Sequence, residues 1–194
     1  MMFLIYWIDN MFEDDLNQSR KGVSFVRGFF SLLGREMIEH LEAPKKGEHP
    51  PDLIETLEDG YQAFYEVKED ARSIQTGNIF FEERALHRFS LYAKENKAFA
   101  LLIIVPYKEP KPLIFYVSND LREALESLRL QSIARYCSVA GDNSAGWIVP
   151  ISHARSLGLN IVNRFLSNEE IMIFESLFKS AILTEENHLF MRWS

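Results

Sequence analysis

The stretch PDLIETLEDGYQAFYEVK, residues 51–68, decides the fold expected for this chain. Residues 52–57 and 61–68 each have the composition of a β-strand. The intervening Glu58-Asp59-Gly60 is a turn signal, since Asp-Gly favours the tight turns of hairpins. The sequence therefore predicts a β-hairpin.

Three polar residues of this hairpin are expected to share one patch. Side chains at positions i and i+2 of a strand project from the same face, about 6.5–7 Å apart, which brings Glu66 and Lys68 together. Asp52 begins the neighbouring strand, so pairing can bring its carboxylate alongside Glu66.

Such a patch suits phosphodiester hydrolysis. Close carboxylates repel each other, and a bound divalent cation relieves the repulsion. Magnesium prefers carboxylates, waters and phosphate oxygens, and it can activate a water for attack. A lysine beside it can hold that water and stabilise charge on the phosphate. A Glu-x-Lys pair alone is more often a solvated strand face, so the surrounding elements must support the interpretation.

The rest of the chain predicts alternating helices and strands. Residues 23–42 carry apolar residues at three- and four-residue spacing, which predicts a helix ended by the Pro- and Gly-containing segment 43–51. Ser167 with Glu170 is placed for a capping box. Ser118, Asn119 and Asp120 offer N-cap residues for another helix, with Glu123 placed for a capping box there. The other expected elements are a loop at 69–78, a helix at about 82–95, a buried strand at 98–105, a strand at 113–117, a helix at 120–130, an edge strand ending in Pro150-Ile151 at 147–151, and a helix at 168–182.

The order of these parts resembles the PD-(D/E)xK nuclease superfamily, which has the restriction-endonuclease-like fold. Pro51-Asp52 matches the first signature and Glu66-Val67-Lys68 the second. The segment from Thr76-Gly77-Asn78 to Glu82 is similar to a TGN segment of some phage-like and prokaryotic members, although here an Arg- and Lys-containing helix follows. The resemblance covers about residues 23–118 and implies an α/β domain with a central mixed β-sheet flanked by helices.

The resemblance also implies roles for individual residues. Asp52 and Glu66 would bind Mg²⁺ or Mn²⁺, and Lys68 would orient the attacking water. A glutamate from the first helix often joins the site, for which Glu39 is the choice and Glu36 the alternative. Asn78 and Glu82 would lie near the substrate, or else serve as a turn residue and as the start of the next helix. His49, three residues before Asp52, could face the substrate.

Composition sets further bounds. The 194 residues fit one domain, 1–194. The net charge of −7 argues against non-specific coating of nucleic acid but does not exclude a nuclease. Cys137 is the single cysteine, so the chain cannot form an internal disulfide. This predicts a reducing compartment, the cytoplasm. The apolar start of residues 1–10 is too short to span a membrane, and it is either a strand or sequence upstream of a true start at Met11.

The leading hypothesis is thus a Mg²⁺- or Mn²⁺-dependent endonuclease or exonuclease acting on DNA. Hydrolysis of RNA is one alternative. A catalytically silent module of the same fold, binding nucleic acid or protein, is another. The apolar stripes of the helices at 120–130 and 168–182 fit either packing on the sheet or a homodimer interface.

Overall fold

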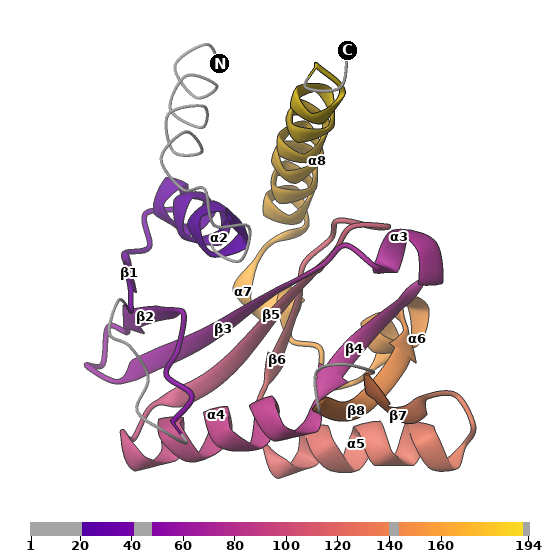
Figure 1. Ribbon diagram of the computed structural model, residues 1–194. Coiled ribbons are helices and arrows are strands. Elements are labelled where there is room, and N and C mark those ends of the chain that lie inside the picture. The colour runs from indigo at the N-terminus through magenta and orange to yellow at the C-terminus, as the bar shows by residue number, and fades with distance from the viewer. Residues whose placement is uncertain (1–20, 41–47, 140–143, 192–194) are drawn as a thin grey trace.

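The computed structural model describes residues 21–40, 48–139 and 144–191 and shows two β-sheets with helices around them (Figure 1). The first sheet has the strand order β1-β2-β3-β5-β6, and the second has the order β4-β8-β7. In chain order the described elements are α2 (Lys21–Leu32), β1 (Met37–Glu39), β2 (Leu53–Thr56), β3 (Gln62–Asp70), α3 (Ser73–Thr76), β4 (Asn78–Glu82), α4 (Glu83–Glu95), β5 (Phe99–Pro106), β6 (Leu113–Tyr116), α5 (Asn119–Leu130), β7 (Arg135–Val139), β8 (Ser144–Pro150), α6 (Ile151–Ser156), α7 (Val162–Phe165) and α8 (Asn168–Met191).

The predicted hairpin is confirmed. Strands β2 and β3 pair antiparallel, with Leu53 opposite Tyr65 and Thr56 opposite Gln62. Gly60 in the connecting turn has a φ of +82°, a left-handed conformation that glycine adopts without steric strain. The turn residues therefore fix which residue of β2 faces which residue of β3.

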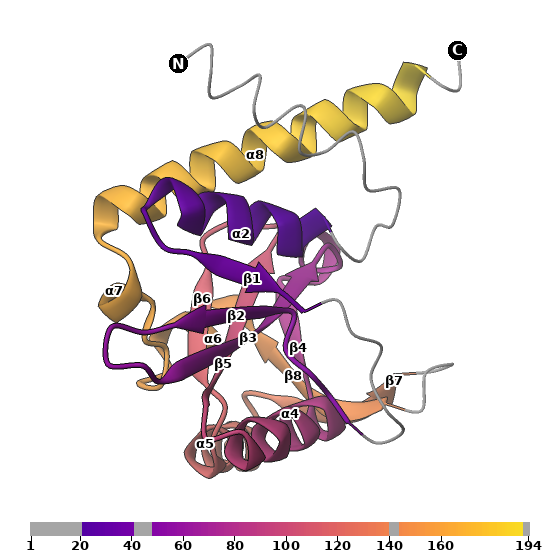
Figure 2. The same cartoon turned by 90° about the vertical axis from the view of Figure 1, so that its left-hand side faces the viewer.

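Strand β3 lies at the centre of the first sheet and has a core on each side. It pairs in parallel with the apolar strand β5, and β5 pairs antiparallel with β6, so the sheet is mixed. Tyr65 packs in a core with α2, α7 and α8. Phe64, on the opposite face, packs in a core with α4, α5, β4 and β8. The two sets of helices cover opposite faces of the sheet (Figures 1 and 2), which confirms the expected mixed α/β architecture.

The first helix is shorter than predicted, because α2 ends at Leu32 rather than continuing to residue 42. Gly34 has a φ of +76° and turns the chain out of the helix. The apolar spacing continues beyond this point because Met37 is also buried, but it is buried from an edge strand that pairs with β2. Glu39 therefore belongs to β1 and not to a helix; Leu41 lies outside the described residues.

The second sheet was largely missed. Residues 69–78 hold the end of β3, the short helix α3 and the first residue of β4, and are not one loop. Strands β4 and β7 were not predicted. The strand predicted at 147–151 is present as β8, but its predicted place at a sheet edge is wrong, since β8 lies between β4 and β7. Pro150 is tolerated because it is the last residue of β8. Gly146 lets β4 approach closely: a Cβ there would lie 2.0 Å from the carbonyl oxygen of Phe81.

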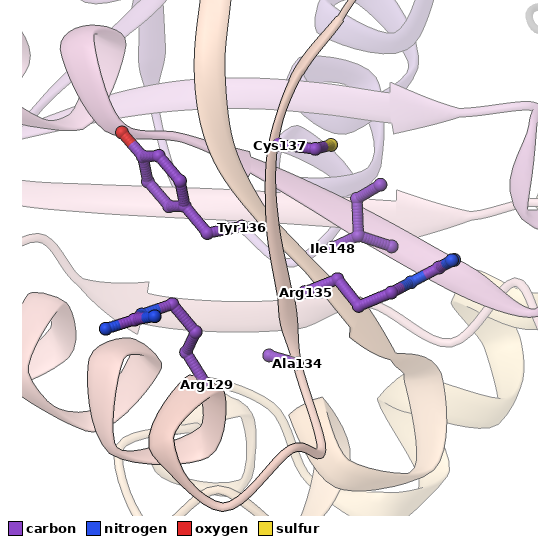
Figure 3. A pocket seen from close by; sticks show the side chains of 6 residues that line it. All are labelled: Arg129, Ala134, Arg135, Tyr136, Cys137 and Ile148. Atoms are coloured by element: carbon purple, nitrogen blue, oxygen red, sulfur yellow. The ribbon is translucent and has the colours of Figure 1, made fainter.

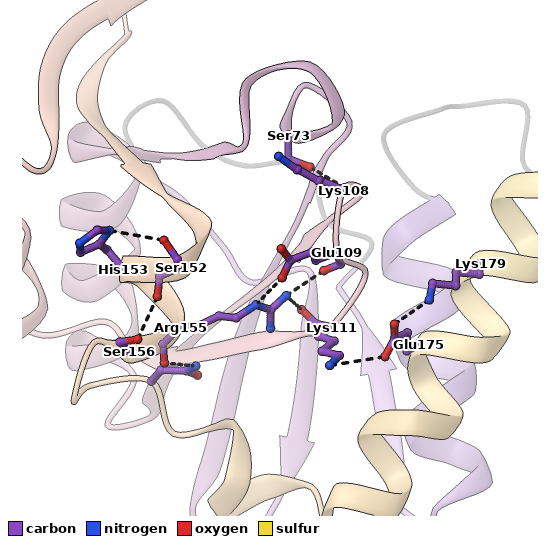
Figure 4. Close-up of polar contacts among 11 residues, drawn as sticks. Ser73, Lys108, Glu109, Lys111, Ser152, His153, Arg155, Ser156, Glu175 and Lys179 are labelled. Carbon is purple, nitrogen blue, oxygen red and sulfur yellow. Dashed lines mark hydrogen bonds and ion pairs between the residues drawn. The ribbon is translucent and has the colours of Figure 1, made fainter.

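Polar contacts cap α8 and join α6 and α8 to the segment between β5 and β6. The capping box of α8 is confirmed, because Ser167 N–H donates to Glu170 Oε2 at 2.7 Å and Glu170 N–H donates to Ser167 Oγ at 3.2 Å. The N-cap residue of α5, Ser118, makes no side-chain capping bond, so the second box is absent. Arg155 of α6 contacts Glu109, and Lys111 contacts Glu175 of α8 (Figure 4).

Two predictions concern residues 1–10, a strand or a sequence upstream of Met11, and both lie outside the described residues. Within the part of the chain that the structure describes, none of the helices combines the length and apolar character needed for a bilayer span.

A polar network beneath α2 joins the segment between α2 and β1 to β2 and β3. Arg35 donates to both oxygens of Glu55, at 2.8 and 2.7 Å, and Tyr65 Oη donates to Glu55 Oε2 at 2.5 Å. The Arg35 guanidinium also lies 4.4 Å from the ring centroid of Phe30. Burial acts to raise the pKa of Glu55, but the hydrogen bonds from Arg35 and Tyr65 prevail and hold it below its ordinary value.

We expect Arg35→Ala to lower the free energy of unfolding by about 3 kcal/mol at neutral pH, because it leaves the buried Glu55 carboxylate without its charged partner. A carboxyl group with a lowered pKa stabilises the fold above its ordinary pKa of 4.5, and this contribution disappears as the pH falls. The deficit of the variant should therefore shrink on acidification. Urea denaturation of both proteins at several acidic pH values measures this difference in the free energy of unfolding. Lys179→Ala, which removes an exposed pair with Glu175, is the control and should change little. A deficit independent of pH would contradict the electrostatic origin.

Candidate active site

The hairpin register brings Asp52 and Glu66 together. Asp52 immediately precedes β2, and its N–H donates to the carbonyl oxygen of Tyr65 at 2.8 Å. In return, Val67 N–H donates to Asp52 Oδ2 at 2.8 Å. Because Leu53 faces Tyr65, extending the register by one residue sets Asp52 opposite Glu66. Cross-strand partners share a face, so the two carboxylates project to the same side of the sheet.

The environment of Asp52 disfavours its charge. Burial, followed by the neighbouring charge of Glu66, raises the pKa of Asp52 to about 7, although the hydrogen bond from Val67 N–H opposes the change. Both causes would be reduced by a cation bound between the carboxylates. The chemistry of this pair therefore fits a divalent metal ion.

His49 also reaches this pair. Its Nε2 lies 3.1 Å from Glu66 Oε2, and its ring stands edge-on to Phe89 of α4 at 6.0 Å between centroids. The contact with Glu66 raises the pKa of His49 against the opposing effect of burial, and the charges of Asp52 and Glu82 act in the same direction. The position of His49 three residues before Asp52 was the sequence signal that pointed to it.

Lys68 projects from the same face of β3 as Glu66. Its Nζ lies 5.0 Å from the centroid of the Phe80 ring, which belongs to β4. Asp70, one further i+2 step along β3, accepts a hydrogen bond from Phe80 N–H at 3.3 Å. Burial raises the pKa of Asp70, while the charge of Lys68 acts to lower it. The second sheet thus meets the end of β3 beside Lys68.

Glu39 lies near Asp52 but on the other face of the sheet. It pairs with Leu53, whose side chain belongs to the core beneath α2. Arg27 of α2 forms an ion pair with Glu39, with 3.0 Å between Arg27 Nη1 and Glu39 Oε2. The charge of Glu39 is still among the causes that raise the pKa of Asp52. Glu36, the alternative from the sequence, is exposed and precedes β1.

Glu82 and Asn78 lie in different surroundings, although both belong to β4. Glu82 ends β4, and its charge acts on His49, so it lies toward the carboxylate pair. The side chain of Asn78 instead donates to the carbonyl oxygen of Thr76 at 2.8 Å. Asn78 therefore makes the local contact of a turn residue, which was the alternative to a place near the substrate.

Among residues 21–40, 48–139 and 144–191, no group of three or more His, Cys, Asp or Glu side chains is arranged to hold a metal ion. The candidate ligands Asp52 and Glu66 are a pair and not a closed cage. A pair is compatible with Mg²⁺, which often keeps several waters and uses one or two carboxylates.

Two surface pockets lie elsewhere, over α5 and the second sheet. One, of about 420 Å³, is lined by Arg129, Arg135, Tyr136 and Cys137 among others (Figure 3). The other, of about 800 Å³, extends along α5. Its arginines are paired, since Arg129 contacts Glu126. None of the candidate site residues named from the sequence lines either pocket.

Asp52→Asn should stabilise the protein in the presence of a chelator, because the amide keeps an acceptor for Val67 N–H and removes a buried charge beside Glu66. A carboxyl with a pKa raised to about 7 destabilises the fold as the pH rises from 3.8 through that value. The free energy of unfolding of the variant should therefore exceed that of wild type by an amount that grows with pH, to on the order of 1–3 kcal/mol. Thermal denaturation across this range measures the gain. An equal pH profile for both proteins would show that Asp52 carries no such charge.

No family model matches the chain, and no curated protein matches it. Two solved structures are similar to it in fold. One is Hjc, a Holliday junction resolvase from Archaeoglobus fulgidus, with 16% identity and a TM-score of 0.44, covering 72% of this chain and 96% of that chain. The other is D212, a nuclease from a fusselovirus, with 14% identity and a TM-score of 0.42, covering 86% of this chain and 96% of that chain. Because the identities and TM-scores are low, neither likeness carries an argument about function.

Proposed function

We propose that this protein is a metal-dependent nuclease that hydrolyses DNA phosphodiester bonds with water, using Asp52, Glu66 and Lys68. The observation that carries the proposal is the hairpin register, which sets a partly buried carboxylate opposite a second one with a lysine two residues further along the same strand face. Isolated Glu-x-Lys pairs are common. A partly buried aspartate beside the pair, with its pKa raised by burial and by the second carboxylate, is not expected of a merely solvated strand face.

Asp52 and Glu66 would hold the metal ion, Mg²⁺ or Mn²⁺. A bound divalent cation polarises the phosphate and makes a water more acidic. The chain contributes the orientation of its ligands: Val67 N–H fixes one oxygen of Asp52, and β3 is held between β2 and β5. Ligands carried by central strands are positioned more rigidly than ligands on loops.

Lys68 would orient the attacking water and stabilise negative charge on the phosphate. In the reaction the water oxygen bonds to phosphorus, the bond from phosphorus to the leaving nucleotide oxygen breaks, and that oxygen takes a proton. The Phe80 ring beside Lys68 Nζ favours the charged ammonium through a cation–π contact. This contact limits the directions that the amine can take.

Glu82 and Glu39 would have supporting roles. The charge of Glu82 acts on His49 from β4, and that of Glu39 acts on Asp52 from the opposite face. Both add to the negative potential that attracts a cation. The contact of Glu39 with Arg27 makes it a weaker candidate for direct metal binding than Asp52 or Glu66.

Cleavage of labelled linear, single-stranded and branched DNA, and of RNA, with Mg²⁺ or Mn²⁺ tests the proposal. Wild type should cut, and Lys68→Ala should lose at least about 100-fold in rate, as expected for the loss of a group that stabilises transition-state charge. Lys94→Ala, which changes an exposed lysine of α4, is the matched control and should cut like wild type.

Metal affinity distinguishes the proposed ligand, Asp52, from the residue proposed to orient the water, Lys68. Calorimetric titration should give Lys68→Ala nearly the Mn²⁺ affinity of wild type, whereas Asp52→Ala should bind much more weakly. Equal cutting by wild type and Lys68→Ala would place the chemistry elsewhere. Equal metal affinity for wild type and Asp52→Ala would refute the assigned ligand. An absence of both cutting and metal binding would favour a silent binding module.

A further inference from the structure

His49 places a buried ring nitrogen against a carboxylate of the candidate site. Nε2 is buried from solvent and has no hydrogen-bond partner in the part of the chain that the structure describes. It nevertheless lies 3.1 Å from Glu66 Oε2, so the two atoms are close without the alignment of a hydrogen bond. A buried nitrogen that faces a carboxylate without an aligned hydrogen bond leaves both groups able to take a cation between them.

The distance between these two atoms, which is that of an ion pair, also fits neighbouring ligands of one metal ion. Metal–ligand bonds of about 2.1 Å that meet at about 90° separate adjacent ligand atoms by about 3.0 Å. The observed 3.1 Å between His49 Nε2 and Glu66 Oε2 matches this value. The two atoms are therefore already spaced as one edge of a coordination shell.

The surroundings hold His49 in this place. Its ring packs against Phe89 of α4, and it precedes Pro50, which restricts the backbone of the residue before it. The charges of Asp52 and Glu82 also act on the imidazole. This combination of a fixed nitrogen and a negative potential favours a cation at the same point.

We infer that His49 Nε2 and Glu66 Oε2 bind the same divalent cation as adjacent ligands, and that this nitrogen ligand makes the site select Mn²⁺ over Mg²⁺. The inference rests on the proposed function, which requires a metal beside Glu66. The selectivity follows from ligand chemistry, since imidazole suits transition metals whereas magnesium prefers an all-oxygen shell.

Pulsed electron paramagnetic resonance of the Mn²⁺-loaded full chain tests the inference directly, because a coordinated imidazole gives a ¹⁴N coupling to Mn²⁺. The spectrum is recorded at about pH 8, where a ligating imidazole is neutral. Wild type should show the coupling, and ¹⁵N labelling of histidine alone should replace it with a ¹⁵N pattern. His49→Gln should abolish the coupling and lower Mn²⁺ affinity at least about tenfold, with a smaller effect on Mg²⁺.

His40→Ala is the matched control, because the backbone N–H of His40 donates to the carbonyl oxygen of Asp52 at 3.0 Å. This variant should keep the coupling. Bound Mn²⁺ without a nitrogen coupling, or a coupling lost only in His40→Ala, would overturn the assignment of His49 and leave the proposed nuclease standing. If Mn²⁺ did not bind to wild type at all, the metal-dependent function would fail together with this inference. The ¹⁵N-histidine experiment needs no variant, so it remains decisive on the nitrogen ligand if His49→Gln does not fold.

Discussion

The candidate site depends on the register of β2 against β3. The hydrogen bonds that join Asp52 to Tyr65 and Val67 set this carboxylate opposite Glu66. A slip of one residue would reverse the faces of a whole strand, moving Leu53 out of one core and Asp52 away from Glu66. Apolar burial on both faces of the sheet therefore fixes the position of the polar groups, and the chemistry follows from the packing.

Holding two carboxylates together opposes stability, and other contacts of the same sheet offset this. Burial and the charge of Glu66 make ionised Asp52 unfavourable, as is common where function requires a strained electrostatic arrangement. On the other face, Arg35 binds Glu55 beneath α2. One face of the hairpin thus carries a compensated ion pair, and the other carries a carboxylate pair that a cation would complete.

The local features could be predicted from the sequence, and the long-range ones could not. The hairpin was accessible because Asp59-Gly60 and the flanking strands are adjacent in the chain, and this was enough to pair Asp52 with Glu66. The change from helix to strand after Leu32 could not be predicted, because Met37 continues the helical spacing of apolar residues. In the structure Met37 instead pairs with Glu55, far along the chain. The second sheet was missed for the same reason. Its strand β4 brings Phe80 to Lys68 and Glu82 toward His49, contacts that no sequence spacing reveals.

The location of the metal is the central claim, and anomalous diffraction from a crystal grown with Mn²⁺ tests it most directly. The account predicts a strong anomalous peak in contact with carboxylate oxygens of both Asp52 and Glu66, on the face of β3 that carries Lys68. A well-ordered crystal with Mn²⁺ bound only elsewhere, or with none between these two carboxylates at saturating concentration, would contradict it.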